Sequence, residues 1–212
     1  MKNQQEPAPV QGEQIHNTVR QIKRSFHSLM NGVASQSMRN KGLDYKVNWG
    51  VSVPHLKEMA AEYEKNYSLA VELWKEDIRE CKIMATLLMP ASEMPVEVVD
   101  IWMEQTHSQE IAELAVFHLY QYLEAAPIFA YRWMASEHPL YQLSGFLLIG
   151  CLFRQGKEPD ERGINEYLDQ LQLALSEGSL MVRHAALNSL NRFCELGDSY
   201  LYIAHKAQPD YV

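Results

Sequence analysis

The sequence has few cysteines and no long apolar run, and each absence excludes a class of protein. Its three cysteines are odd in number and lack CxxC spacing, which argues against a disulfide framework and against a structural zinc site. The longest apolar stretch, 147–153, is too short to span a bilayer and is typical of a buried helix. The polar first residues lack the apolar segment of a secretion signal. We therefore expect a cytoplasmic protein with no membrane partner and no bound metal.

Glycine is also too sparse to form a phosphate-binding loop. Gly32, Gly42 and Gly50 lie too far apart for the nucleotide-binding patterns, so we expect no cofactor. His107, Glu110 and Glu113 follow one another at helical spacing and could be read as metal ligands. No second matching motif accompanies them, and a solvated acidic helix face is the simpler interpretation.

Positive charge is missing from the middle of the chain. The net charge is −8, and residues 83–131 contain no Lys or Arg but seven Asp or Glu. This weighs against tight binding of duplex DNA, which requires several phosphates to be neutralised. Residues 1–82 hold 12 Lys or Arg against 10 Asp or Glu. One basic cluster there is a candidate phosphate-binding patch, with a solvated helix face as the alternative: Arg20, Lys23, Arg24, Arg39, Lys41 and Lys46.

Apolar residues recur at three- to four-residue steps nearly throughout, which predicts an all-α protein. We expect a flexible tail over 1–12, a single domain over 13–212 and an irregular connector over 31–48. At least eight helices should form antiparallel pairs, without a sheet of three strands. Ser68 and Thr106 are predicted to cap helices, and Gly197 to end the last strong one. The predicted helices cover 14–30, 54–65, 69–75, 77–89, 95–105, 106–123, a short segment from 127, 139–153, 160–175 and 179–197.

Small residues lie near the centres of the longer helices at regular intervals. They are Ala85-Thr86, Ala115, Ser144-Gly145 and Ala185-Ala186, separated by 30, 30 and 40 residues. Such a period is typical of an α-solenoid of HEAT type, in which helix pairs stack closely. An irregular helical bundle, which needs no period, is the alternative.

Several segments in this order resemble one family. They are residues 49–60 (WGVSVPHLKEMA), 72–74 with 80–85, 131–136 (YRWMAS) and 181–187 (MVRHAAL). Over about residues 49–197 the chain resembles the HEAT-like-repeat alkylpurine DNA glycosylases of the DNA alkylation repair family. The resemblance implies a helical array whose concave face holds duplex DNA. It also implies excision of cationic N3- or N7-alkylated purines, with a carboxylate stabilising the oxocarbenium-like sugar.

The family's catalytic pattern is poorly matched by this chain. The family carries a Trp-x-x-x-Asp motif, an aromatic residue on a later helix and an arginine that meets the phosphate backbone. By resemblance, Gln109 occupies the first aromatic position and Glu113 the position of the catalytic Asp. Asn188 occupies the later aromatic position, and Leu143 that of the arginine. We therefore expect Gln109, Leu143 and Asn188 to lie on the groove of the helical array, together with Glu113.

Two functions follow from this pattern. The first is a family member without glycosylase activity, a scaffold that binds a protein or a non-standard DNA structure through its concave face. The second is an active glycosylase that excises N3- or N7-alkylated purines with Glu113 as the oxocarbenium-stabilising carboxylate.

Overall fold

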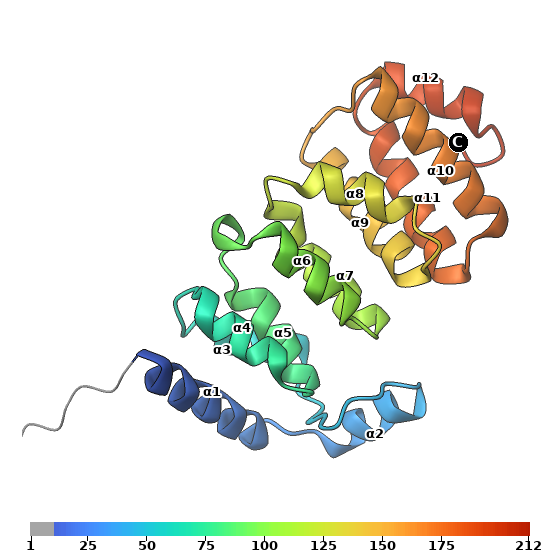
Figure 1. Ribbon diagram of the computed structural model, residues 1–212. Helices are drawn as coiled ribbons and strands as arrows, with labels where there is room; N and C mark the ends of the chain where they lie inside the picture. The colour runs from blue at the N-terminus through green and yellow to red at the C-terminus, as the bar shows by residue number, and fades with distance from the viewer. Residues whose placement is uncertain (1–10) are drawn as a thin grey trace, which may run out of the picture. The chain divides into compact units, whose positions relative to one another are not determined.

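The chain is helical over almost all of the part that the structure describes. The computed structural model describes residues 11–212, which form twelve α-helices and two short 3₁₀ helices (Figure 1). Within this range β-structure is confined to one isolated bridge between Val47 and Ile78. The predicted all-α class is confirmed for these residues. The elements are α1 (Gln11–Ser28), α2 (Gly32–Asn40), α3 (Val53–Ala60), α4 (Tyr67–Lys75), α5 (Arg79–Leu88), η1 (Ala91–Glu93), α6 (Val96–Glu104), α7 (Gln109–His118), η2 (Tyr120–Tyr122), α8 (Ala126–Met134), α9 (Pro139–Arg154), α10 (Glu161–Glu177), α11 (Leu180–Cys194) and α12 (Asp198–Ala207).

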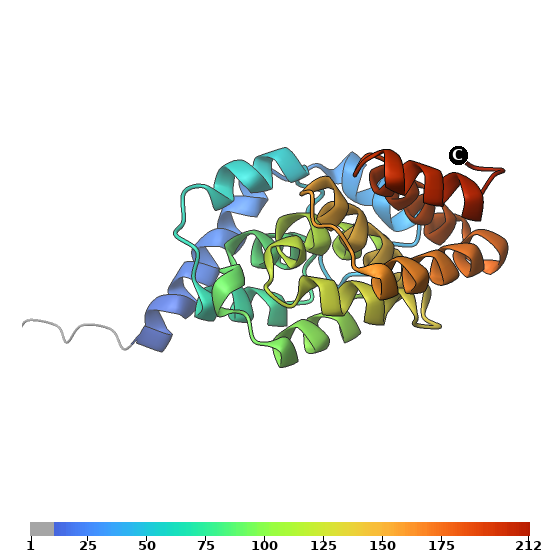
Figure 2. The same cartoon turned by 90° about the horizontal axis from the view of Figure 1, so that it is seen from above.

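The described chain divides into two compact units, which meet in the sequence between Glu93 and Met94. In the first unit α1 packs on α4, and α3 and α4 pack on α5 (Figure 1). In the second unit α9 is central and packs against α7, α8 and α11, while α11 also packs against α10 and α12 (Figure 2). Residues 1–10 of the predicted tail lie outside the described residues, and Gln11 and Gly12 already belong to α1. That one domain spans 13–212 stays a prediction.

The small residues expected to permit close stacking lie in α5, α7, α9 and α11, and all are buried. Gly145 in α9 shows why a small residue is needed there. A Cβ at this position would collide with the backbone nitrogen of Met134 and would lie 2.9 Å from the carbonyl oxygen of Ala130. The backbone of α8 therefore lies directly against α9, as paired-helix repeats require.

The longest apolar run of the sequence lies within α9. Leu148, Ile149 and Leu152 in this run are at most 3% exposed, because neighbouring helices cover α9 on several sides. Burial of such side chains stabilises the unit by about 1.5–3 kcal/mol each. Across residues 11–212, no helix has both the length and the apolar character needed to cross a membrane.

Two helices differ from the sequence-based prediction. The predicted irregular connector over 31–48 is wrong at 32–40, where α2 forms, capped by Asn31 Oδ1, which accepts a hydrogen bond from the Ala34 backbone N–H at 3.0 Å. After Gly197 the chain continues into α12, which is not among the predicted helices. Helix α2 buries no residue and α12 buries only Ala204. Helix α12 nevertheless carries apolar residues at helical spacing, Tyr200, Ile203 and Ala204, beyond the glycine at which the helical pattern was expected to end.

Two helix starts are also corrected. Asn66, rather than Ser68, caps α4, because its Oδ1 accepts from the Leu69 backbone N–H at 2.8 Å. Ser108, rather than Thr106, caps α7, and its Oγ accepts from the Ile111 backbone N–H at 3.3 Å. The Thr106 hydroxyl instead donates to the Trp102 carbonyl oxygen at 2.7 Å and closes the end of α6.

Candidate nucleic-acid interface

One side of α7 carries two of the predicted site residues. Gln109 and Glu113 are one helical turn apart, and Gln109 Nε2 donates a hydrogen bond to Glu113 Oε1 at 2.7 Å. Gln109 is exposed and Glu113 is half-buried. The Glu113 carboxylate is thus hydrogen-bonded to a solvent-exposed amide, that of Gln109. By resemblance, the family has an aromatic side chain at the position of Gln109.

A surface hollow of about 650 Å³ begins at the next turn of α7. Phe117, one turn beyond Glu113, lines it and is 40% exposed. Glu113 itself is not among the lining residues. The side chains that matter here come from α7, α9 and α11 and from the end of the chain: Phe117, Leu147, Arg154, Asn188, Arg192 and Tyr211.

Two arginines give this hollow its positive charge. One terminal guanidinium nitrogen of Arg154 donates to Gln121 Oε1 at 3.3 Å, and Gln121 is buried. Arg192 pairs with Glu195, with 2.6 Å between Nη1 and Oε2. A guanidinium offers five N–H donors, so each arginine keeps further donors for a ligand. Among residues 11–212, Glu195 is the only acidic side chain that lines the hollow.

The four residues that match the family pattern lie in different surroundings. It joins Gln109 and Glu113 on α7, and it places Asn188 of α11 at the hollow. Leu143 is 2% exposed and does not line this hollow, so its expected place on a DNA-binding groove stays a prediction. Leu147, one turn later in α9, lines the hollow instead.

Sequence reasoning missed Phe117, Arg154 and Arg192. Phe117 and Arg192 follow Glu113 and Asn188 by four residues, which is the spacing of neighbours on one helix face. That spacing was the available signal for these two. Arg154 ends α9, and only the packing of α9 beside α11 brings it to the same hollow.

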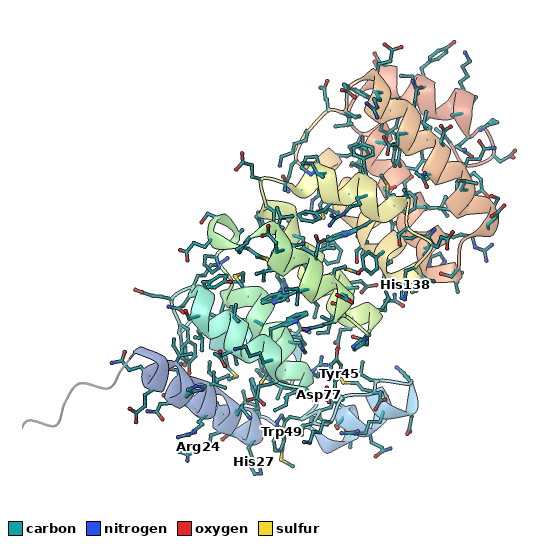
Figure 3. The ribbon with its side chains drawn as sticks, in the orientation of Figure 1. Arg24, His27, Tyr45, Trp49, Asp77 and His138 are labelled. Carbon is teal, nitrogen blue, oxygen red and sulfur yellow. The ribbon has the colours of Figure 1, made fainter. Side chains whose placement is uncertain are left out.

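The predicted basic cluster is spread over two helices and a connector. Arg20 and Arg24 are exposed on α1, and Figure 3 shows Arg24 on its outer edge. Lys23 is paired with Glu76 at 2.9 Å and is partly buried. The remaining three are exposed, but their contacts differ: Arg39 donates to the Tyr45 carbonyl oxygen at 3.4 Å, Lys41 follows the last turn of α2, and the Lys46 backbone N–H donates to Asp77 Oδ2 at 3.2 Å.

Metal and thiol chemistry find no support in residues 11–212. No three His, Cys, Asp or Glu side chains in this range gather closely enough to hold a metal ion, and this includes His107, Glu110 and Glu113. Burial raises the pKa of the Cys81 thiol to about 12 and also raises the pKa of Cys151 and Cys194. A thiol with a raised pKa is a poor nucleophile at neutral pH.

Comparison with known proteins agrees with this architecture. The family described as DNA alkylation repair enzyme matches residues 22–191. A solved structure described as a new family of proteins related to the HEAT-like repeat DNA glycosylases, with affinity for branched DNA structures, superposes with a TM-score of 0.76. It is 18% identical, and the match covers 89% of this chain and 80% of that one. No curated protein matches the chain. The predicted HEAT-like fold is confirmed, and the chain belongs to the DNA alkylation repair enzyme family.

Proposed function

We propose that this protein binds branched or otherwise non-standard DNA and does not excise bases. The observation that carries the proposal is the composition of the hollow on α7, α9 and α11. It contains Arg154, Arg192 and Asn188, which suit phosphate oxygens, while Glu113 lies outside it. The concave DNA-binding face expected from the sequence remains part of this proposal.

Arginine is suited to DNA binding because its planar guanidinium group can donate hydrogen bonds to two phosphate oxygens at once. Arg154 and Arg192 are exposed at the hollow, and Asn188 and Asn191 add neutral donors. The absence of cations over 83–131 weighs against extensive neutralisation of a duplex. A few localised contacts instead favour a DNA whose shape brings several phosphates close together. The structurally similar protein is described as having affinity for branched DNA structures.

Base excision is disfavoured by the surroundings of Glu113. A carboxylate stabilises a developing cation best where water is excluded, because its field is weakened in water. Gln109 beside it is exposed, and Asn188 replaces the later aromatic residue. Glu is also one methylene longer than Asp, and a displacement of about 1 Å can cost ~10²-fold in rate.

The alternative function, excision with Glu113 as the catalytic carboxylate, is favoured by one contact. The hydrogen bond of 2.7 Å from Gln109 holds one carboxylate oxygen in place, which is a form of preorganisation. The test is release of 7-methylguanine from alkylated duplex DNA. We expect release at the spontaneous rate only, and no change in Glu113→Gln. Enzyme-dependent release that disappears in this variant would establish the alternative.

DNA binding is tested by titrating a labelled four-way junction and a duplex of equal length at several salt concentrations. We expect the junction to bind more tightly, with plain duplex near the non-specific range of about 10⁻⁴–10⁻⁶ M. Arg192→Gln should weaken junction binding and lower the salt slope by about 0.9 per lost phosphate contact. Arg183→Gln is the matched control, because Arg183 is exposed on the same helix but does not line the hollow.

Two results would contradict the proposal. Nanomolar binding of plain duplex would show that the chain is not selective for DNA shape. Equal affinities for the junction in wild type, Arg192→Gln and Arg154→Gln would show that the hollow does not contact DNA. A protein partner for the same face would then have to be sought.

A further inference from the structure

The turn between α1 and α2, together with the start of α2, exposes three apolar side chains within five residues. Leu29 is 37% exposed, Met30 53% and Val33 83%. Isolated exposed apolar residues are common, but three at one turn form a small protruding surface. This surface, Leu29, Met30 and Val33, is called the apolar turn below.

The apolar turn is held rigidly by the chain segment beneath it. The Asn31 backbone N–H donates to the Trp49 carbonyl oxygen at 2.9 Å, and the Ser35 hydroxyl donates to the Asn48 carbonyl oxygen at 2.7 Å. Gly50 has φ +72°, and a Cβ there would collide with the Asn31 carbonyl oxygen. The turn and the segment 48–50 are therefore in direct backbone contact.

A buried ion pair fixes that segment in turn. Arg79 and Glu80 are at most 1% exposed and lie 3.1 Å apart. The two oxygens of Glu80 accept hydrogen bonds from the backbone N–H groups of Trp49 and Val51, both at 3.2 Å. Arg79 also donates to the Val51 carbonyl oxygen at 2.8 Å. An apolar surface on such a support loses little conformational entropy when it binds a ligand.

A second surface hollow, of about 580 Å³, lies against the apolar turn. Besides the three apolar side chains it is lined by Asn31, Gly32, Gly50, Ser52 and His55. The Ser52 hydroxyl and His55 Nδ1 are 3.0 Å apart and are hydrogen-bonded to each other. The hollow thus offers apolar walls and the polar side chains of Asn31, Ser52 and His55, which is a suitable environment for a flat heteroaromatic ring.

Cations flank the apolar turn on both sides in the sequence. Residues 14–43 contain five Lys or Arg and no Asp or Glu. On α1, Arg20, Arg24 and His27 are exposed at helical spacing, and the His27 ring meets Trp49 edge-on at 5.4 Å. Figure 3 shows Arg24 and His27 on the same edge of α1, near Trp49. Beyond the turn, Arg39 of α2 and Lys41, which follows this helix, add two more cations, so the partner should be an anion with exposed apolar surface.

From this arrangement we infer that the apolar turn receives an unstacked base at a DNA branch point, while Arg20 and Arg24 contact the adjoining phosphates. This inference rests on the proposed binding of branched DNA and names the part of the DNA that is recognised. Apolar side chains inserted at opened base steps are a general way to bind distorted DNA. Branch points supply such bases at little cost, because their stacking is already interrupted.

The experiment uses the full chain and a four-way junction with 2-aminopurine next to the branch point. Its fluorescence rises when the base leaves the stack. We expect wild type to raise the signal, and Met30→Ser/Val33→Ser to abolish the rise and weaken junction binding about tenfold. Duplex affinity should stay unchanged. Both side chains are largely exposed, so the variant should fold.

The matched control is Ile128→Ser, which removes an apolar side chain that is 69% exposed in the other unit. If wild type and the double variant bind the junction equally and change the fluorescence equally, the inference is wrong while the proposed function stands. If wild type does not bind the junction at all, both are wrong. Loss of self-association in the double variant, without loss of junction binding, would identify the turn as a contact between two copies and would also overturn the inference.

Discussion

Replacement of Gly145 by alanine should destabilise the second unit, although alanine favours helices. Gly145 lies within α9, where Gly→Ala alone gains about 1 kcal/mol of helix propensity. The new methyl group would collide with the Met134 backbone nitrogen and lie 2.9 Å from the Ala130 carbonyl oxygen. These are backbone atoms of α8, which cannot rotate away as a side chain can. Overpacking of this kind costs about 1–3 kcal/mol or more, so the net effect should be a loss.

Gly150→Ala in the same helix is the control for this reasoning. Its Cβ would lie 3.4 Å from Ser189 Cα and 3.5 Å from Ser189 Cβ, close to ordinary van der Waals contact. The gain in helix propensity should therefore survive, and stability should be unchanged or higher by up to about 1 kcal/mol. Gly145 thus faces the backbone of α8 at colliding distance, whereas Gly150 faces Ser189 of α11 close to van der Waals distance.

The assay is thermal and urea unfolding followed by circular dichroism. For a chain of this length, 1 kcal/mol corresponds to roughly 2–4 °C in the melting temperature. We expect Gly145→Ala to melt below wild type and Gly150→Ala at or above it. If Gly145→Ala were as stable as Gly150→Ala, α8 and α9 would not pack at the distance that the paired-helix fold requires, and the reasoning would fail.

Two further predictions concern the first unit. Glu80→Gln should destabilise it by about 3–5 kcal/mol in urea unfolding, because Arg79 loses its buried counter-charge and the new amide group faces backbone N–H groups. Glu72→Gln, which breaks the exposed pair with Lys75, should cost less than about 1 kcal/mol, and equal costs would contradict this account. Burial raises the Cys81 pKa from 9.0 to about 12, so the unfolded thiol ionises first and stability should fall as pH rises from 9 toward 12, by up to about 1.4 kcal/mol per unit. Urea unfolding against pH should show a shallower fall in Cys81→Ala, and an identical fall would assign the effect to other groups.

The helical architecture could be predicted because it depends on local signals. Asp160 caps α10, with its Oδ1 accepting from the Gly163 backbone N–H at 2.7 Å, and Pro139 lies in the first turn of α9. Both residues act within their own turn of helix, so the sequence alone identifies them. Helix α2 was not predicted because it buries no residue. It is held by contacts between residues distant in sequence, such as the hydrogen bond from the Ser35 hydroxyl to the Asn48 carbonyl oxygen.

The candidate site was less predictable because it depends on which face of each helix is covered. Leu143 and Leu147 are one turn apart in α9, and their chemistry is identical. Packing decides that Leu143 is buried and that Leu147 borders the hollow. Likewise, the residues next to Arg79 and Glu80 in the sequence do not indicate a buried ion pair. The backbone N–H groups that donate hydrogen bonds to Glu80, those of Val51 and Trp49, lie 29 and 31 residues away.

The residues that maintain this fold and those that determine its chemistry are physically separate. Gly145 is constrained by the α8 backbone, so any larger side chain there disturbs the repeat. Gln109 and Asn188 are exposed, and substitutions at exposed positions usually change stability by no more than about 0.5 kcal/mol. We therefore expect that side chains at these two positions can change without cost to the scaffold. Membership of a family of repair enzymes consequently fixes how these helices pack but not whether a base is excised. We propose that the side chains on α7, α9 and α11 decide that question, because arginines line the hollow and the carboxylate of Glu113 lies outside it.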